Sequence, residues 1–137
     1  MRIIKVTNSV NLVGCESLSL IVTGGRSYEF TDGDREMLSK IHELFGIRQL
    51  IHGCCTGADS CAKLWAEESE IDTRGFPVTK EEWRRNGKKA GPIRNAAMLK
   101  YAIESPTAAL VAFPGGNGTA DMHNRAIAAG IVVFERK

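Results

Sequence analysis

The feature that most constrains this chain is an apolar run that breaks into a glycine-rich turn and leads into residues at helical spacing. The pattern occurs three times, at residues 18–26, 48–57 and 110–119. The apolar runs are typical of buried strands, the glycines allow sharp turns, and the spacing that follows predicts a helix. Strands that alternate with helices favour right-handed crossovers and a mostly parallel sheet with helices on both faces. We therefore expect a three-layer, Rossmann-like α/β fold.

Turn and capping residues give the expected limits of the elements. Thr31 or Asp32 caps the first long helix, Gly46 ends it, and Pro92 fits the first turn of a later helix. The expected strands are residues 18–22, 48–52, 71–77, 107–113 and 131–134, and the expected helices are residues 32–45, 58–70, 92–104 and 119–129. The buried side of the third helix is expected at Ile93, Ala97, Leu99 or Lys100, and Ala102 or Ile103.

Two segments outside this pattern are assigned less regular structure. Residues 3–6 and 10–13 are short β-like runs, which predict a hairpin or an edge-strand extension. Residues 79–91 are polar and contain the chain's one local basic cluster, so we expect a loop with at most a helical turn.

Length and composition fit one domain. The chain has 137 residues, of which 43% are hydrophobic, so it can bury a core without disulfides or a metal. We expect a single domain over residues 1–137, with its core at 18–134 and an N-terminal β extension at 1–17. No segment resembles a secretory signal or a spanning helix, so we expect a cytoplasmic protein without a membrane partner.

Charge and cysteine usage disfavour several classes of partner. The 18 Lys and Arg residues nearly balance the 16 Asp and Glu residues, and a net charge of +2 argues against a nucleic-acid partner. The four cysteines form no C-x-x-C pair, and no histidine has a second ligand at metal-binding spacing. We expect free, mostly buried thiols, no metal site and no cofactor.

The three glycine turns are expected to line one cleft, because the carboxyl ends of parallel strands share an edge of the sheet. Gly115, Gly116, Gly118 and Thr119 then form a candidate phosphate cradle, in which free N–H groups and the positive end of a helix dipole attract an anion. The alternative is a tight turn that needs glycine only for a positive φ.

Five other side chains are candidates for the same cleft, each with a structural alternative. Arg94 could clamp a phosphate, and Arg26 follows the first turn, although both could be solvated. Asp59 could hold ribose hydroxyls or cap backbone amides. Trp83 could stack on a base or pack against the protein. Asp121 could act as a general base or nucleophile on an N-glycosidic bond, or only favour the helix dipole.

The spacing of these residues resembles a known family. Four motifs carry the resemblance: Thr23-Gly24-Gly25-Arg26; Gly53-x-x-x-Gly57-Ala58-Asp59; Trp83-x-x-x-Gly87-x-x-Ala90-Gly91-Pro92-x-Arg94-Asn95; and Phe113-Pro114-Gly115-Gly116-x-Gly118-Thr119-Ala120-Asp121. Together they resemble the YspA-like, cpYpsA-related branch of the SLOG superfamily, which is related to the LOG phosphoribohydrolases and to DprA. The candidate nucleotide-binding residues are Gly24, Gly25, Arg26, Gly53, Gly57, Asp59, Trp83, Arg94, Asn95, Gly115, Gly116, Asn117, Gly118 and Thr119.

The resemblance does not extend to the catalytic acid of the LOG enzymes. Their signature Pro-Gly-Gly-x-Gly-Thr-x-x-Glu places a glutamate eight residues after the proline, where this chain has Met122. Asp121 lies one residue earlier and, at about 100° per helical residue, points elsewhere. Asp121 and Arg94 remain the candidate catalytic residues.

Three functions stay open from the sequence. The resemblance implies a phosphoribohydrolase-like enzyme acting on a nucleoside phosphate, or a non-catalytic sensor or sequesterer of a nucleotide-derived ligand such as an ADP-ribose derivative. A DprA-like binder of single-stranded nucleic acid is a weaker alternative because the charge is nearly balanced. Relatives often pair through helices, so the resemblance also implies a homodimer or larger homo-oligomer.

Overall fold

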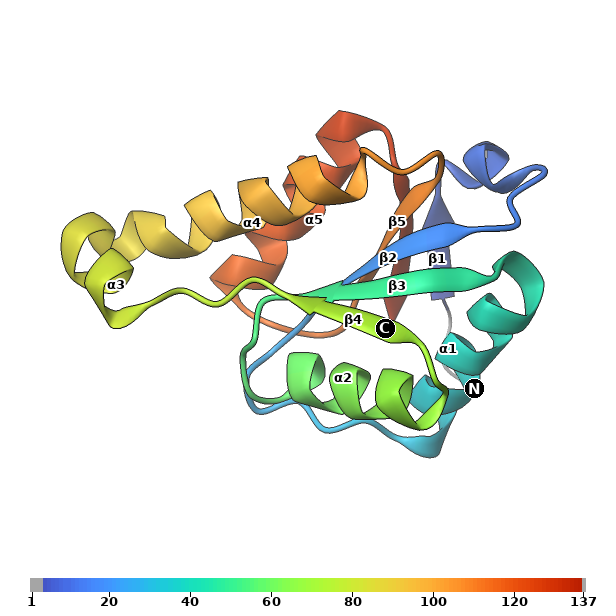
Figure 1. Cartoon of the computed structure of the whole chain (residues 1–137), viewed down its shortest axis with the longest axis horizontal. Helices are drawn as coiled ribbons and strands as arrows, with labels where there is room; N and C mark the ends of the chain where they lie inside the picture. The colour runs from blue at the N-terminus through green and yellow to red at the C-terminus, as the bar shows by residue number, and fades with distance from the viewer. Residues whose placement is uncertain (1–3, 137) are drawn as a thin grey trace.

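A computed structural model describes residues 4–136 as a six-stranded sheet between two layers of helices (Figure 1). The fold is therefore the expected three-layer α/β fold. In chain order the elements are β1 (Ile4–Thr7), η1 (Ser9–Leu12), β2 (Leu18–Thr23), α1 (Asp32–Phe45), β3 (Ile47–His52), α2 (Ala58–Glu68), β4 (Asp72–Gly75), α3 (Lys80–Asn86), η2 (Gly87–Lys89), α4 (Ala90–Ala102), β5 (Ala108–Ala112), α5 (Asn117–Ala129) and β6 (Val132–Arg136).

The order of the strands explains where a ligand site can form. The sheet runs β1-β6-β5-β2-β3-β4, with β2 to β6 parallel and β1 antiparallel to β6. From β2 the chain moves outward through β3 and β4, then returns to the other side of β2 for β5 and β6. The reversal lies between β2 and β5, and in open α/β sheets ligands bind at the carboxyl ends of strands beside such a point.

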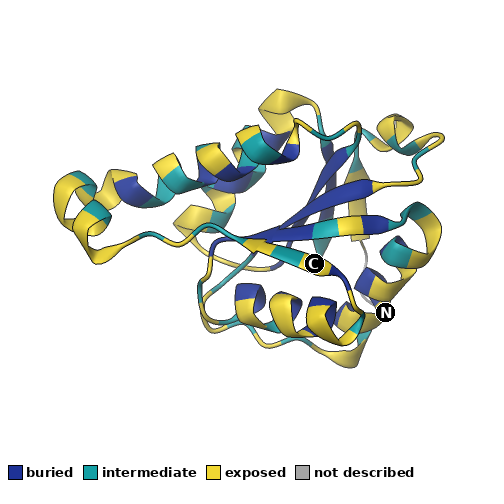
Figure 2. Ribbon diagram, viewed as in Figure 1, coloured by how far each residue is buried: buried dark blue, intermediate teal, exposed yellow. Residues whose placement is uncertain are grey.

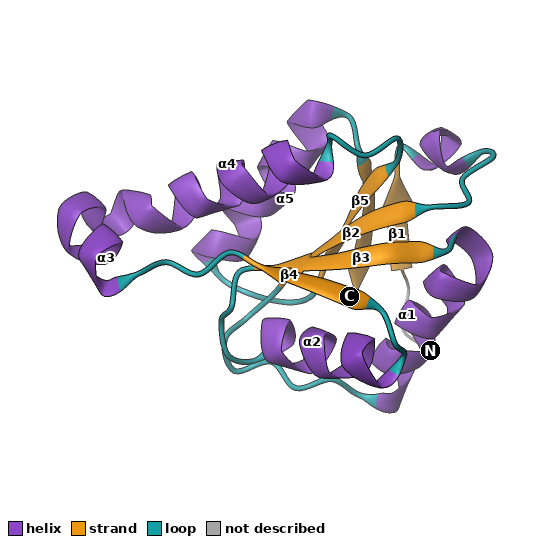
Figure 3. Cartoon of the chain, in the orientation of Figure 1, coloured by secondary structure: helices purple, strands orange, loops and turns teal. Residues whose placement is uncertain are grey.

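Helices cover both faces of the sheet, with α1 and α2 on one side and α4 and α5 on the other (Figures 1 and 3). All residues of β2 and β5 are buried, as expected for central parallel strands with near-continuous apolar sequence (Figure 2). Leu20 packs in the α1–α2 layer and Ile21 in the α4–α5 layer, so successive side chains serve opposite faces. No helix within residues 4–136 has the length and apolar character needed to cross a membrane.

The N-terminal extension forms only one of its two expected strands. β1 pairs with β6 and forms the edge of the sheet, which confirms the edge-strand alternative, whereas the second run forms the short helix η1, so no hairpin forms there. Asn8 adopts a left-handed conformation (φ 59°) that turns the chain, and its side chain donates to Ile131 O at 3.1 Å. Asn11 similarly donates to Gly130 O at 2.9 Å. These bonds hold η1 across the end of the α5–β6 connection. Ile3 lies outside the described residues.

Residues 80–91 are helical, which corrects the expected loop. Thr79 and Glu82 form a reciprocal capping box at the start of α3, and η2 leads directly into α4. The Thr-x-x-Glu spacing is a helix-start signal that the basic composition of the segment obscured.

The buried side of α4 agrees with the expectation at Ala102, which is fully buried, and at Leu99, which packs against the core, but differs from it elsewhere. Ile93 and Ile103 are 51% and 50% exposed, Ala97 is exposed, and the buried positions include Asn95 and Met98. The N-terminal half of this helix faces the cleft rather than the core, so polar side chains point inward there.

A buried ion pair that the sequence analysis missed joins α1 to β6. Arg136 Nε donates to Asp34 Oδ1 at 2.6 Å, and the other oxygen of Asp34 accepts bonds from the Tyr28 hydroxyl and the Thr31 N–H. Burial alone would raise the pKa of Asp34, but these hydrogen bonds and the Arg136 charge hold that pKa below its ordinary value.

Candidate functional site

The three glycine turns are joined to one another by hydrogen bonds, with the first turn in the middle. Gly25 N–H donates to Pro114 O of the third turn at 2.8 Å, and Gly25 O accepts from Ala58 N–H, after the second turn, at 3.1 Å. The Thr56 hydroxyl adds a bond to Arg26 O at 2.9 Å. The turns therefore form one connected surface at the carboxyl ends of β2, β3 and β5.

This connection leaves no room for a side chain at several of the glycines. A Cβ at Gly24 would lie 2.5 Å from the Cβ of Ala58 and 2.9 Å from that of Phe113. Gly57 has a φ of 75°, and a Cβ there would collide with Gly25 O. These two glycines are thus required by the close approach of the turns, whether or not a ligand binds.

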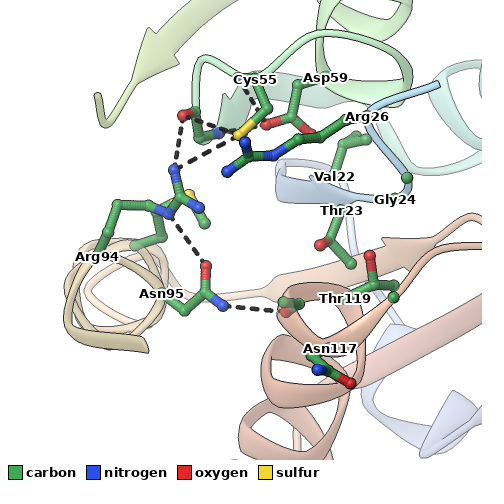
Figure 4. Close-up of a pocket in the computed structure, with 15 residues that line it drawn as sticks. Val22, Thr23, Gly24, Arg26, Cys55, Asp59, Arg94, Asn95, Asn117 and Thr119 are labelled. Atoms are coloured by element: carbon green, nitrogen blue, oxygen red, sulfur yellow. Dashed lines mark hydrogen bonds between the residues drawn. The ribbon is translucent and has the colours of Figure 1, made fainter. Parts of the chain in front are cut away.

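A cavity of about 240 Å³ opens where the turns meet (Figure 4). Eleven of the predicted site residues line it: Gly24, Gly25, Arg26, Gly53, Asp59, Arg94, Asn95, Gly116, Asn117, Gly118 and Thr119. The remaining lining residues, which the sequence analysis missed, are Val22, Thr23, Cys55 and Met98. Thr23 precedes the predicted Gly24 and Cys55 lies between the predicted Gly53 and Gly57, whereas only the structure brings in Met98 from α4.

The N-terminus of α5 faces this cavity without a side-chain cap. Gly116 is the N-cap residue, and its carbonyl accepts the first intrahelical bond from Ala120 N–H at 3.0 Å. The N–H groups of Asn117, Gly118 and Thr119 therefore have no intrahelical acceptor. By contrast, α1 and α3 each begin with a threonine capping box that uses an acidic side chain. The first turn of α5 contains no acidic residue.

Arg94 and Arg26 extend toward each other across the cavity (Figure 4). Arg94 Nη1 donates to Gly53 O at 2.7 Å and lies 3.9 Å from Cys55 Sγ, while its Nε donates to Asn95 at 3.2 Å. A Cβ at Gly53 would meet this guanidinium at 2.5 Å, so a side chain there would displace Arg94 from its present position. Within residues 4–136, Arg94 Nη2 and the side chain of Arg26 make no hydrogen bond, which leaves donors for an anion.

Asp59 supplies the only carboxylate among the residues that line this cavity. It is 6% exposed, and its Oδ2 accepts the N–H groups of Gly53 at 2.9 Å and Cys55 at 3.3 Å. Burial raises the pKa of Asp59, although the two backbone bonds and the nearby arginines act in the opposite direction. The carboxylate thus holds the second turn in place while it borders the cavity.

A second cavity of about 280 Å³ adjoins the first. Arg26, Gly53, Cys55 and Arg94 line both. Trp83, a predicted binding residue, lines only the second cavity, together with Cys54, Thr56, Pro77 and Val78.

Three predicted residues line neither cavity: Gly57, Gly115 and Asp121. Asp121 Oδ2 instead accepts bonds from Arg125 Nε at 2.9 Å and from Asn95 Nδ2 at 3.0 Å. Met122, at the position of the LOG glutamate, is fully buried in the α4–α5 core.

The cysteines and histidines around the second turn carry no sign of an activated nucleophile. The four cysteines are free but none is fully buried, and Cys54 is exposed, which corrects the expectation of mostly buried thiols. Burial and the Asp59 charge raise the pKa of Cys54, which keeps it protonated. Buried His52 accepts Cys54 N–H through Nδ1 at 3.1 Å, and burial lowers its pKa. No three His, Cys, Asp or Glu side chains in the described part of the chain are placed to hold a metal ion.

Comparison with known proteins matches the sequence of this chain to a family. Residues 18–84, which contain β2, the first two turns and Trp83, match the YspA, cpYpsA-related SLOG family. A curated relative, the Gene 61 protein of Mycobacterium phage D29, is 36% identical over 91 residues, covering 62% of this chain and 68% of the relative. The chain belongs to the YspA, cpYpsA-related SLOG family. Membership supports a nucleotide-related function and a small-molecule ligand in general terms. No solved structure matches the chain significantly.

Proposed function

We propose that this SLOG protein binds a nucleotide or nucleotide-derived ligand, with a phosphate in the first cavity. The observation that carries the proposal is the uncapped N-terminus of α5, whose N–H groups face the guanidinium groups of Arg94 and Arg26 across one cavity. Oriented amides at a helix N-terminus and two arginines form a strong anion site, because the amides already point at the cavity and hydrogen bonds from a guanidinium to an anion are charge-assisted.

The roles of the remaining lining residues follow from their chemistry. Residues 116–119 contact the phosphate oxygens, and the hydroxyl of Thr119 adds a donor. Asp59 lies across from α5, where its carboxylate can accept bonds from ribose hydroxyls. Asn95 holds the cleft together, since its Nδ2 donates to both Gly118 O and Asp121 Oδ2.

Thermal unfolding with a panel of nucleoside 5′-monophosphates, ADP-ribose and inorganic phosphate tests the proposal. A ligand that binds only the folded state raises the melting temperature with its concentration. Arg26→Ala should weaken binding about tenfold, because charge-assisted bonds to a phosphate are worth about 1.5–3 kcal/mol. Arg35→Ala is the control and should not change binding, because Arg35 lies on the exposed part of α1, where it pairs with Asp32 and donates to Phe30 O. If no member of the panel raises the melting temperature, the proposal is wrong.

Hydrolysis of the N-glycosidic bond is a second candidate, favoured by the position of Asp59. Its raised pKa and its place beside the cavity suit a general base, which would take a proton from water as water attacks C1′. The bond from C1′ to the base then breaks, and the base and ribose 5-phosphate leave. Asp121 is the alternative base, but its Oδ2 is already bound to Arg125 and Asn95.

Chromatographic detection of released base distinguishes the enzyme from a sensor. Loss of release in Asp59→Asn but not in Asp121→Asn assigns the base to Asp59, and the reverse result assigns it to Asp121. Ligand binding without any released base supports a sensor or sequesterer instead.

A further inference from the structure

The second cavity opens beside the phosphate site and differs from it in chemistry. Both cavities share the two arginines, but the second has no acidic side chain among its lining residues. Its other walls are the side chains of Pro77, Val78 and Trp83 and part of the second glycine turn. The second cavity thus combines an aromatic and aliphatic surface with the cationic edge of the first.

Trp83 is much more exposed than the other tryptophan of the chain, Trp65. It lies on α3, which packs against η2 and α4 and sits apart from the sheet at the far end of α4 (Figure 1). Its side chain is 40% exposed. By contrast, Trp65 on α2 is 6% exposed in the core and donates to Ser39 Oγ at 3.1 Å. The chain therefore places one tryptophan in its core and the other at the wall of a cavity.

We propose that the second cavity binds the base of a nucleoside 5′-phosphate, stacked on Trp83, while the phosphate occupies the first cavity. Arg26 and Arg94 then flank the link between base and phosphate, because they line both cavities. This inference rests on the proposed nucleotide function and adds to it an orientation and a ligand class. Ribose 5-phosphate or inorganic phosphate alone would leave the second cavity empty.

The aromatic wall also predicts how the site ranks its ligands. Among the side chains that line the second cavity, uncharged hydrogen-bonding groups are limited to the hydroxyl of Thr56, the indole N–H of Trp83 and the two thiols. Stacking depends on the area of the base and tolerates different ring edges. Purine nucleotides should therefore bind more tightly than pyrimidine nucleotides.

Fluorescence of a single tryptophan provides the test. The chain has two tryptophans, so Trp65→Phe leaves Trp83 as the only emitter. Titration of this variant with AMP or GMP should change the emission of Trp83 and saturate, whereas ribose 5-phosphate should not change it. Calorimetry on the unmodified protein gives the same affinities if Trp65→Phe folds poorly.

Variants of Trp83 complete the test and separate it from the test of the phosphate site. Trp83→Ala should weaken AMP and GMP binding about tenfold or more, as expected for loss of one stacked base, and leave ribose 5-phosphate binding unchanged. Trp83→Phe should retain most of the affinity. If ribose 5-phosphate binds as tightly as AMP and GMP, or if Trp83→Ala has no effect, the base site is overturned and the phosphate site stands. If neither nucleotides nor phosphates bind, both proposals fail.

Discussion

Gly115 and Gly118 lie three residues apart in the third turn, but the structure requires glycine at only one of them. A Cβ at Gly115 would collide with Thr119 Oγ1 and would lie 2.7 Å from Gly25 N. A Cβ at Gly118 would meet nothing within 4 Å. Gly115 thus serves the packing of the turns, whereas the open space at Gly118 faces the proposed ligand.

Alanine at each position should separate stability from binding. Gly115→Ala should lower the free energy of unfolding by about 1–3 kcal/mol through overpacking. Gly118→Ala should raise it by up to about 1 kcal/mol, because alanine is the better helix former. Gly118→Ala should nevertheless weaken phosphate-dependent thermal stabilisation. Urea unfolding and ligand titration of both variants check this, and unchanged ligand binding in Gly118→Ala would argue against close approach of a phosphate to the backbone.

The ionised side chain of Asp59 is expected to lower the free energy of unfolding at neutral pH. Its folded-state pKa is raised, so the folded protein holds this proton more tightly than the unfolded chain does. Protonated Asp59 therefore stabilises the folded protein. This stabilisation is fully present below the pKa of Asp59 in the unfolded chain, about 3.9, and is lost as the pH rises through the pKa of Asp59 in the folded protein. Asp59→Asn, whose amide oxygen can still accept the two backbone bonds, should be at least as stable at pH 7. Its unfolding free energy should fall less between pH 4 and pH 7 than that of the unmodified protein.

Asp34 should have the opposite pH dependence. The pKa of Asp34 is lower in the folded protein than in the unfolded chain, so its ionised carboxylate stabilises the fold. This stabilisation is present above the pKa of Asp34 in the unfolded chain and is lost as the pH falls through its pKa in the folded protein. Asp34→Asn should destabilise the protein by about 3–5 kcal/mol at pH 7, because Arg136 would remain buried without its partner charge. The difference from the unmodified protein should shrink as the pH falls below 4. Asp32→Asn removes an exposed pair with Arg35 and should change stability by less than about 1 kcal/mol.

At the scale of elements, the sequence predicts the structure best where one physical signal dominates. Central strands such as β2 are mostly apolar, and α1 is capped by Thr31 at its start and by Gly46 at its end, so apolar runs and caps determine these elements. The sequence does not predict η1, because its shape depends on side-chain bonds to the distant residues 130 and 131. Such long-range bonds leave no local pattern in the sequence.

Within the candidate site, the side of α4 that points inward is likewise not predicted by the local sequence pattern. Hydrophobic periodicity favours Ile93 as a buried residue, yet Arg94 and Asn95 point inward because this part of the helix borders a polar cavity. The family motif identified both polar residues, although periodicity did not. The motif could not reveal that Asp121 bonds to Asn95 and Arg125 and lies away from the cavity, since that depends on the packing of α4 against α5.

At the scale of the whole molecule, the helical layer of α4 and α5 is the expected surface for self-association. The two helices pack side by side (Figure 1) and expose Ile93, Ile103 and Ile127. Exposed apolar side chains on a helical layer can contribute to an interaction surface. We therefore expect a homodimer that pairs through this layer.

Lysine substitution on each helical layer tests the expected dimer. Ile103→Lys combined with Ile127→Lys should shift the protein to a monomer in light scattering coupled to gel filtration. Leu64→Lys is the matched control, because Leu64 is 59% exposed on α2 in the opposite layer. A monomeric unmodified protein, or dissociation by Leu64→Lys, would contradict the expected interface.

The absence of a cap on α5 has a further consequence for the protein without its ligand. The first amides of α1 and α3 are satisfied by threonine side chains, whereas those of α5 depend on whatever occupies the cavity. A bound phosphate would thus complete the helix as a capping residue does. In hydrogen exchange, the amides of residues 117–119 should exchange rapidly in the free protein and become protected when ligand binds, while those of β2 remain protected in both states.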